Sequence, residues 1–261
     1  MQNTLRARLD AGEIAIGAQL RFGLPAIAEL FAVAGFDWVL IDSEHAPQTS
    51  TGIQTQLQAV SGTGATALVR VPANDVELIR LYLDMGAAGI VAPFINTADQ
   101  AIAGASACRY PPRGTRGWGP HRAADYGLSA QEYTRTINDS VLYIPIIESV
   151  EAVANISDIL SVDGVDACIV GPVDLSISLG RPFEFDHSAY QDALVRVADA
   201  ARACGKTAGI GVQGSPLDPG AGEQEVAGGF RLLLTGGDEW FLSTCCARAV
   251  ANLKALREPH P

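Results

Sequence analysis

The chain has 261 residues, 48% of them apolar, which is enough to bury the core of one large α/β domain or two small ones. A formal net charge of −11 argues against nucleic acid or an anionic membrane surface as a partner. No apolar run approaches the length of a membrane span, the N-terminal residues lack the core of a signal peptide, and the five cysteines lack metal-site spacing, so we expect reduced thiols and a cytoplasmic location.

Eight short apolar segments have the composition of strands that are buried on both faces. In chain order they span residues 14–20, 38–41, 67–71, 89–94, 141–147, 166–170, 208–212 and 230–235. Between most of them the apolar residues recur with helical spacing, which predicts helices over 24–34, 53–60, 76–85, 150–160, 190–204 and 239–256. Asp75 and Thr97 are typical of helix N-terminal caps, so a further helix is expected after Thr97.

The alternation of strands and helices predicts a single-domain (β/α)₈ TIM barrel over residues 1–261. Glycines stand where helices would end and strands begin, at positions 35, 86, 164 and 205. A doubly wound open sheet is the alternative, but the glycine-rich turn that usually follows its first strand is missing here. Two irregular stretches, 110–125 and 211–222, have the length of loops that commonly form lids or contact surfaces.

Polar side chains gather at the carboxyl ends of the predicted strands. In chain order these are Asp42, Glu44 and His45 after the second strand, Arg70 in the third, Glu148 after the fifth and Asp174 after the sixth. In a barrel all of these strand ends open onto one face, which is the face that carries active sites. We therefore expect these side chains to converge although they are far apart in the sequence.

Glu148 and Asp174 are the candidates for a metal site. A carboxylate that closes a run as apolar as 143–147 is costly to bury unless it is paired. Asp174 follows the neighbouring strand, about 4.8 Å away, so the two carboxylates could share one cation. Oxygen ligands with further positions left to water and substrate suit Mg²⁺ or Mn²⁺. The alternative is that Glu148 caps the following helix and Asp174 pairs with a lysine or arginine.

His45 is the candidate general acid or base, because an ordinary histidine pKa of about 6.5 allows either role near neutral pH. Asp42, three residues earlier, could orient the imidazole. Arg70 fits stabilisation of an oxyanion, and its alternative role is an internal salt bridge, for example with Glu44.

The turn that follows the sixth predicted strand could bind a carboxylate through backbone N–H groups. Pro172 has no N–H group, so Val173 and Asp174 would supply the donors.

Together these residues resemble those of the metal-dependent (class II) pyruvate aldolases of the HpcH/HpaI family, which include 4-hydroxy-2-oxoheptanedioate and 2-keto-3-deoxy-L-rhamnonate aldolases. The resemblance covers nearly the whole chain and matches the family in order and spacing. It rests on Gly35-Phe36-Asp37-Trp38, Asp42-Ser43-Glu44-His45-Ala46-Pro47, Arg109-Tyr110-Pro111-Pro112 with Gly114, Arg116 and Gly117, Ile147-Glu148-Ser149, and Gly171-Pro172-Val173-Asp174-Leu175-Ser176.

The resemblance implies a (β/α)₈ barrel in a homo-oligomer, usually a hexamer built as a trimer of dimers, whose C-terminal helix packs against a neighbouring subunit. It implies Glu148 and Asp174 as ligands of Mg²⁺, Mn²⁺ or Co²⁺ and Arg70 as the residue that stabilises the enolate of pyruvate. It also implies His45 with Asp42 as the acid–base dyad.

Further positions take their roles from the same resemblance. Asp84 matches a residue that reaches the dyad of a neighbouring subunit. The turn from Gly171 through Pro172 and Val173 to Asp174 would hold the pyruvate carboxylate. Gln19 and Val212 lie where the aldehyde would go.

The implied reaction is the reversible cleavage of a 4-hydroxy-2-keto acid through a metal-bound enolate, in the catabolism of aromatic compounds or sugar acids. Its products would be an aldehyde and pyruvate, or a related 2-keto acid such as hydroxypyruvate. Three positions depart from the family: Gln19 replaces a common Trp, Ile146 after Pro145 replaces a common Gln, and residues 235–239 lack the usual Gly-Val-Asp-Thr. These changes leave the acceptor aldehyde open.

Two other hypotheses remain. One is a related barrel lyase that acts as a keto-acid decarboxylase or a citramalyl-type lyase. The other is a barrel without catalysis that only binds a keto acid, against which the intact set of His45, Arg70, Glu148 and Asp174 argues.

Overall fold

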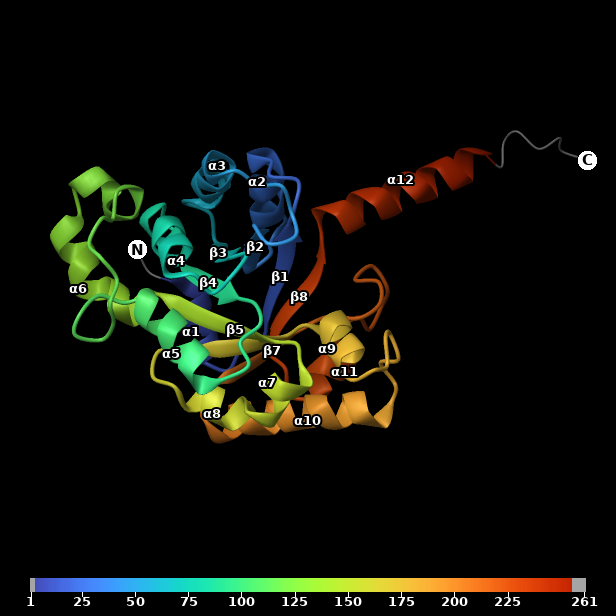
Figure 1. Ribbon diagram of the computed structural model, residues 1–261. Coiled ribbons are helices and arrows are strands. Elements are labelled where there is room, and N and C mark those ends of the chain that lie inside the picture. Colours follow the sequence, from blue (N-terminus) through green and yellow to red (C-terminus); the bar gives the residue numbers. More distant parts are fainter. Residues whose placement is uncertain (1–2, 255–261) are drawn as a thin grey trace, which may run out of the picture.

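The computed structural model describes residues 3–254 and has the predicted TIM-barrel fold. Eight parallel strands close on themselves in chain order, and helices cover the outside (Figure 1). The strands are β1 (Ala15–Leu20), β2 (Trp38–Asp42), β3 (Thr66–Arg70), β4 (Gly89–Ala92), β5 (Leu142–Ile147), β6 (Ala167–Val170), β7 (Thr207–Gly211) and β8 (Leu232–Gly237). The open doubly wound sheet is therefore excluded.

Most predicted helices are present. They are α2 (Pro25–Ala34), α3 (Ser50–Val60), α4 (Val76–Asp84), α5 (Ala98–Ala107), α10 (Ser188–Ala203) and α12 (Asp238–Lys254). The single helix predicted over 150–160 is two, α7 (Val150–Ala154) and α8 (Ile156–Ser161), because Asn155 leaves the helical conformation between them. The last two residues of the helix predicted over 239–256 lie outside the described range.

Other helices were not predicted from the sequence. They are α1 (Thr4–Asp10), α6 (Ala130–Ser140), α9 (Pro172–Ser178), α11 (Glu223–Ala227) and the 3₁₀ helix η1 (Arg122–Gly127). The signals for helix ends are confirmed: Thr97 and Gln100 form a reciprocal capping box on α5, and Asp75 accepts the N–H groups of Glu77 and Leu78. Gly35 ends α2 in a left-handed conformation, with a φ of 103°.

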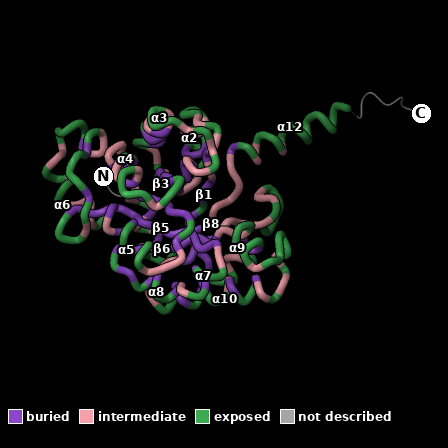
Figure 2. The backbone as a smooth tube through the Cα atoms, viewed as in Figure 1, coloured by how far each residue is buried: buried purple, intermediate pink, exposed green. Residues whose placement is uncertain are grey.

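The strands are buried along most of their length (Figure 2), and their side chains alternate between two apolar cores. On β2, Trp38 and Leu40 pack inside the barrel, while Val39 and Ile41 pack against the helices. Trp38 fits beside β1 only because residue 17 is glycine, since a Cβ there would lie 2.1 Å from the indole ring. We call the carboxyl end of the barrel the mouth. Because side chains alternate with a two-residue period, the inward-facing residues that follow the last apolar ones on each strand point into the mouth.

The strand predicted over 89–94 ends earlier, at Ala92. Phe94 has a φ of 54°, a left-handed conformation that is incompatible with a strand and uncommon for a bulky residue. Its backbone N–H group instead points at Glu148, as described below.

Helix α12 differs from the other long helices because it extends away from the barrel (Figure 1). At its base Phe241 contacts Phe31 and Phe36 of the α2 region. Beyond that point its apolar side chains are exposed, among them Leu242, Val250 and Leu253. Within residues 3–254, no helix has both the length and the apolar character needed to cross a membrane.

Candidate active site at the barrel mouth

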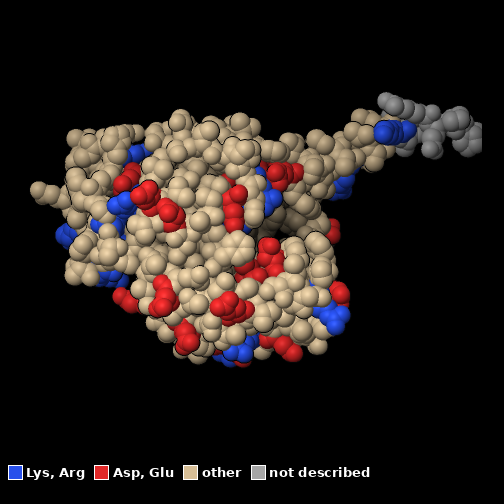
Figure 3. Space-filling model, in the orientation of Figure 1, with Lys and Arg blue, Asp and Glu red and all other residues tan. Residues whose placement is uncertain are grey.

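A cavity of about 570 Å³ opens at the mouth of the barrel. The predicted residues that line it are Gln19, His45, Arg70, Glu148, Gly171, Pro172, Val173, Asp174 and Val212. Gln19 and Arg70 lie in β1 and β3, and the others lie in the segments that follow β2, β5, β6 and β7, so the structure brings together residues from position 19 to position 212. In Figure 3 acidic and basic side chains lie together beside a hollow near the base of α12.

Asp42 lies fully buried beneath this cavity and accepts six hydrogen bonds. Two come from Arg70, at 2.9 Å and 2.6 Å, and one each from Gln19 and Arg21, at 2.8 Å and 3.0 Å. The other two come from the backbone N–H groups of Glu44 and His45. Burial favours the neutral acid, but Arg70 and these N–H groups outweigh it and lower the pKa of Asp42.

Arg70 is held between two carboxylates, which confirms the salt-bridge interpretation. Its Nη2 lies 2.6 Å from Asp42, and its Nε lies 3.3 Å from Glu44. Because the two carboxylates fix the guanidinium in place, the remaining N–H groups of Arg70 are preorganised at the cavity that this residue lines. A structural ion pair and an electrostatic role in the cavity are therefore compatible.

His45 enters the cavity with a side chain that is 55% exposed. Its backbone N–H group donates to Asp42, whereas its imidazole Nε2 lies 3.6 Å from the carboxylate of Glu44. Burial raises the pKa of Glu44, and the electrostatic influence of the neighbouring Arg70 and His45 opposes that rise. Among the described residues the imidazole therefore contacts Glu44, and not Asp42 as expected, because Asp42 binds only the backbone of His45.

Glu148 is an unpaired buried acid of the mouth: the residue is only 7% exposed, and its carboxylate has no ion-pair partner among the described residues. The N–H group of Phe94 donates to Oε1 at 2.7 Å, while Oε2 has no hydrogen bond to a described residue. Burial raises the pKa of Glu148 to about 7, the Phe94 N–H opposes this, and the negative charges of Asp174 and Glu44 add to it. A cation beside Oε2 would relieve this cost.

The alternative roles for the two metal-site candidates are not found. Ser149, and not Glu148, caps α7 by accepting the N–H group of Ala152. Asp174 is exposed in the first turn of α9 and forms no salt bridge within the described part of the chain. Both carboxylates line one cavity, so the oxygen-only donor set and the unpaired Glu148 fit a hard divalent cation such as Mg²⁺ or Mn²⁺.

Gly171 packs closely against this pair, because a Cβ on residue 171 would lie 3.2 Å from Oε2 of Glu148. It precedes Pro172 at the start of α9, where the N–H groups of Val173 and Asp174 have no partner within the helix.

In metal-free protein, Glu148→Gln should become more stable than wild type as the pH rises from 5 to 8. A carboxyl group whose pKa is higher in the folded state than its unfolded value, here about 7 against 4.5, stabilises the fold below the unfolded value. That contribution is lost as the pH rises through about 7. The difference in unfolding free energy between variant and wild type should grow by about 2–3 kcal/mol.

Urea unfolding of both proteins with a chelator, at pH 5 and pH 8, measures this difference. Glu29→Gln, at an exposed position on α2, is the matched control. If the difference in unfolding free energy between Glu148→Gln and wild type were the same at pH 5 and pH 8, the carboxyl group of Glu148 would not have the raised pKa.

Asp84 is not brought to this cavity. It ends α4, next to the amino end of β4, and its carboxylate binds Arg116 at 2.6 Å. The guanidinium of Arg116 is buried between the rings of Tyr110 and Tyr133, at 4.8 Å and 5.8 Å from their centroids. The irregular stretch 110–125 thus anchors Asp84 on the flank of the barrel.

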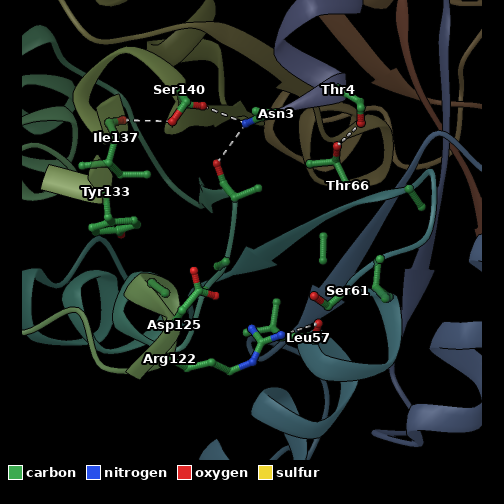
Figure 4. A pocket seen from close by; sticks show the side chains of 18 of the residues that line it. Asn3, Thr4, Leu57, Ser61, Thr66, Arg122, Asp125, Tyr133, Ile137 and Ser140 are labelled. Atoms are coloured by element: carbon green, nitrogen blue, oxygen red, sulfur yellow. Dashed lines mark hydrogen bonds between the residues drawn. The ribbon is translucent and has the colours of Figure 1, made fainter. Parts of the chain in front are cut away.

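A second cavity, of about 370 Å³, lies at the amino ends of β3 and β4 and contains no predicted site residue. Figure 4 shows that its side chains serve the fold: Asn3 donates to the carbonyl of Ser140, Thr4 contacts Thr66, and Arg122 donates to the carbonyl of Leu57. In TIM barrels this end is associated with stability, so the mouth is the better candidate for chemistry.

Arg21 and Phe94 are two of the mouth residues that the sequence analysis missed. Arg21 lines the cavity two residues after Gln19, and Phe94 aims its N–H group at Glu148. Extending the two-residue period past the end of β1 would have found Arg21. No sequence pattern predicts the left-handed conformation of Phe94.

Residues 22–220 match the model of the family described as HpcH/HpaI aldolase/citrate lyase. A 2-keto-3-deoxy-L-rhamnonate aldolase of Shigella sonnei is 37% identical over 257 residues, which cover 98% of this chain and 94% of the relative.

Solved structures agree with the sequence match. An HpcH/HpaI aldolase/citrate lyase family protein from Burkholderia cenocepacia has a TM-score of 0.90 at 33% identity, covering 97% of this chain and 100% of that one. An HpcH/HpaI aldolase from Desulfitobacterium hafniense has a TM-score of 0.90 at 32% identity, covering 98% and 99%.

Proposed function

Because the chain belongs to the HpcH/HpaI aldolase/citrate lyase family and is a carbon–carbon lyase, we propose that it is a divalent-metal-dependent aldolase. It reversibly cleaves a 4-hydroxy-2-keto acid, of the kind met in sugar-acid catabolism, to pyruvate and an aldehyde. The observation that carries this proposal is one cavity lined by Glu148, Asp174, Arg70 and His45. All five cysteines are free thiols, which suits a cytoplasmic enzyme.

Glu148 and Asp174 would hold the metal ion, and the ion would supply Lewis-acid polarisation of the 2-keto acid. The buried, otherwise unpaired carboxylate of Glu148 supports this assignment. The start of α9, where Val173 and Asp174 have free N–H groups, would receive the substrate carboxylate.

Arg70 would stabilise the negative charge that develops on the keto oxygen when the C3–C4 bond breaks. Asp42 and Glu44 fix its guanidinium, so little reorganisation is needed as charge develops. His45 would accept the proton of the 4-hydroxyl group at its imidazole and return a proton after the aldehyde has left. Asp42 positions His45 through the backbone, and Glu44 lies beside the ring.

Release of pyruvate from 4-hydroxy-2-ketopentanoate, with and without Mn²⁺, tests this proposal. We expect turnover only with the metal, and we expect His45→Ala to lower kcat/KM by about 10²-fold because a general base is lost. His187→Ala, at the N-terminal cap of α10, is the matched control. Turnover without any metal would contradict the mechanism, and full activity in His45→Ala would remove His45 from the base role.

The same assay separates the alternatives. A keto-acid decarboxylase would release carbon dioxide and leave the C3–C4 bond intact. A citramalyl-type lyase would require a thioester substrate. A barrel that only binds keto acids would bind pyruvate without releasing it from the hydroxy acid.

We also propose that the enzyme is a homo-oligomer, such as the hexamer expected from the sequence, in which α12 packs on a neighbouring subunit. The exposed apolar side chains of α12 support this, because helices in proteins gain most of their stability by packing an apolar face against a neighbour. In such an assembly Asp84, which lies outside its own mouth cavity, would approach the dyad of the neighbour.

Leu242→Asp combined with Leu253→Asp should dissociate this assembly. Both leucines are more than half exposed, and their helical spacing places them on one stripe of α12. Sedimentation velocity should show a smaller species for the double variant, whereas Ala251→Asp, on the opposite side of the helix, should sediment like wild type. Identical sedimentation of all three proteins would exclude α12 from the interface.

A further inference from the structure

Arg21 is the charged residue of the mouth to which the proposed mechanism gives no role. It follows β1 directly, lines the cavity, and has a side chain that is 32% exposed. Its Nε donates to Asp42 at 3.0 Å, and its Nη1 lies 3.1 Å from Glu239 at the start of α12. Its Nη2 makes no hydrogen bond to any residue between 3 and 254.

The contact with Asp42 does not explain why an arginine is present at position 21. Without it, Asp42 would still accept five hydrogen bonds, two of them from Arg70 and one from Gln19. The ion pair with Glu239 holds the guanidinium from a second side, so Arg21 stays at the cavity it lines even without the contact to Asp42.

Gln19 supplies the complementary group beside Arg21. Its Nε2 donates to Asp42, and its Oε1 makes no hydrogen bond within the described part of the chain. Both residues line the cavity, and together they carry one N–H donor and one carbonyl acceptor without a partner among residues 3–254. A hydroxyl group can use both, because it donates one hydrogen bond and accepts others, whereas a carboxylate only accepts.

The charge around the mouth argues against an anionic group beside Arg21 and Gln19. The two arginines are outnumbered by acids, which are Asp42, Glu44, Glu148, Asp174 and Glu239. Even with a divalent cation and a bound 2-keto acid the balance stays negative, and Arg21 already faces two carboxylates. A neutral group at the acceptor end avoids this repulsion.

We propose that Arg21, with Gln19, binds the hydroxyl groups of a neutral hydroxyaldehyde and so determines which acceptor the enzyme uses. This inference rests on the proposed aldolase function. It narrows the substrate to a 4-hydroxy-2-keto acid that carries further hydroxyl groups beyond C4, and it places their recognition on β1.

Aldol addition of pyruvate to two three-carbon aldehydes tests the inference: glyceraldehyde carries two hydroxyl groups and propionaldehyde carries none. The readout is the ratio of kcat/KM for the two aldehydes, measured with Mn²⁺. We expect wild type to favour glyceraldehyde, and Arg21→Met to lower the ratio about tenfold through the lost hydrogen bond. Arg202→Met, at the far end of α10, should leave the ratio within about twofold of wild type.

An unchanged ratio in Arg21→Met would overturn the inference, as would a preference of wild type for succinic semialdehyde, an anionic acceptor, over glyceraldehyde. Pyruvate C3 exchange in D₂O by wild type, measured without any aldehyde, separates this result from a failure of the proposed function. If that exchange occurs while the ratio does not move, only the role of Arg21 is wrong.

Discussion

Arg70→Ala is expected to slow the exchange of pyruvate C3 protons in D₂O by about 10²–10³-fold, a loss of about 3–4 kcal/mol. Exchange requires the enolate of pyruvate, and Arg70 is the guanidinium that lines the cavity while fixed by Asp42 and Glu44. Truncation removes both the positive charge and the N–H donors from the developing oxyanion. Proton NMR of pyruvate in D₂O, recorded in the presence of the enzyme and Mg²⁺, measures the exchange rate directly.

Loss of Arg70 also leaves two buried carboxylates without their partner, so a general loss of structure must be distinguished from a chemical effect. Arg70→Lys keeps the charge but not the two-pronged contact with Asp42, and we expect an intermediate rate. The thermal midpoint of each variant provides the control. A folded Arg70→Ala protein that exchanges protons at the wild-type rate would show that Arg70 has only a structural role.

Removal of the divalent ion should have an effect at least as large. We expect chelated enzyme to lose pyruvate release by about 10³-fold or more, since Lewis-acid stabilisation supplies several kcal/mol. Added Mn²⁺ should restore wild type. Glu148→Gln and Asp174→Asn should each need far higher Mn²⁺ concentrations, because each replaces an anionic ligand by a neutral amide.

Asp218→Asn is the control for this experiment, because it removes a carboxylate from an exposed position in the loop after β7. It should respond to Mn²⁺ like wild type. If either metal-site variant were restored at the same Mn²⁺ concentration as wild type, that carboxylate would not be a ligand.

The barrel could be predicted because its strands differ so clearly from its helices. Buried runs such as Trp38-Val39-Leu40-Ile41 end abruptly in polar residues, and Gly35 marks the end of α2 before β2. Two helices were missed for physical reasons. The sequence of α6 is mostly polar and the helix buries no residue fully, so few apolar residues mark its period, whereas α9 is only seven residues long and begins at the proline of a turn.

The convergence of Asp42, Arg70 and Glu148 followed from strand ends alone, because parallel strands of a barrel share one mouth. The hydrogen-bond partners of these side chains could not be predicted in this way. That Asp42 gathers six donors depends on the register of β1, β2 and β3, and that Glu148 meets the N–H group of Phe94 depends on one backbone angle. Sequence spacing does not contain these geometric details.

A crystal soaked with Mn²⁺ and pyruvate, examined by anomalous scattering at the manganese edge, tests the site most directly. We predict one peak in each mouth, within ligand distance of both Glu148 and Asp174, with the keto oxygen of pyruvate turned toward Arg70. A manganese ion bound to only one of these carboxylates, or one located elsewhere on the protein, would contradict the proposed mechanism.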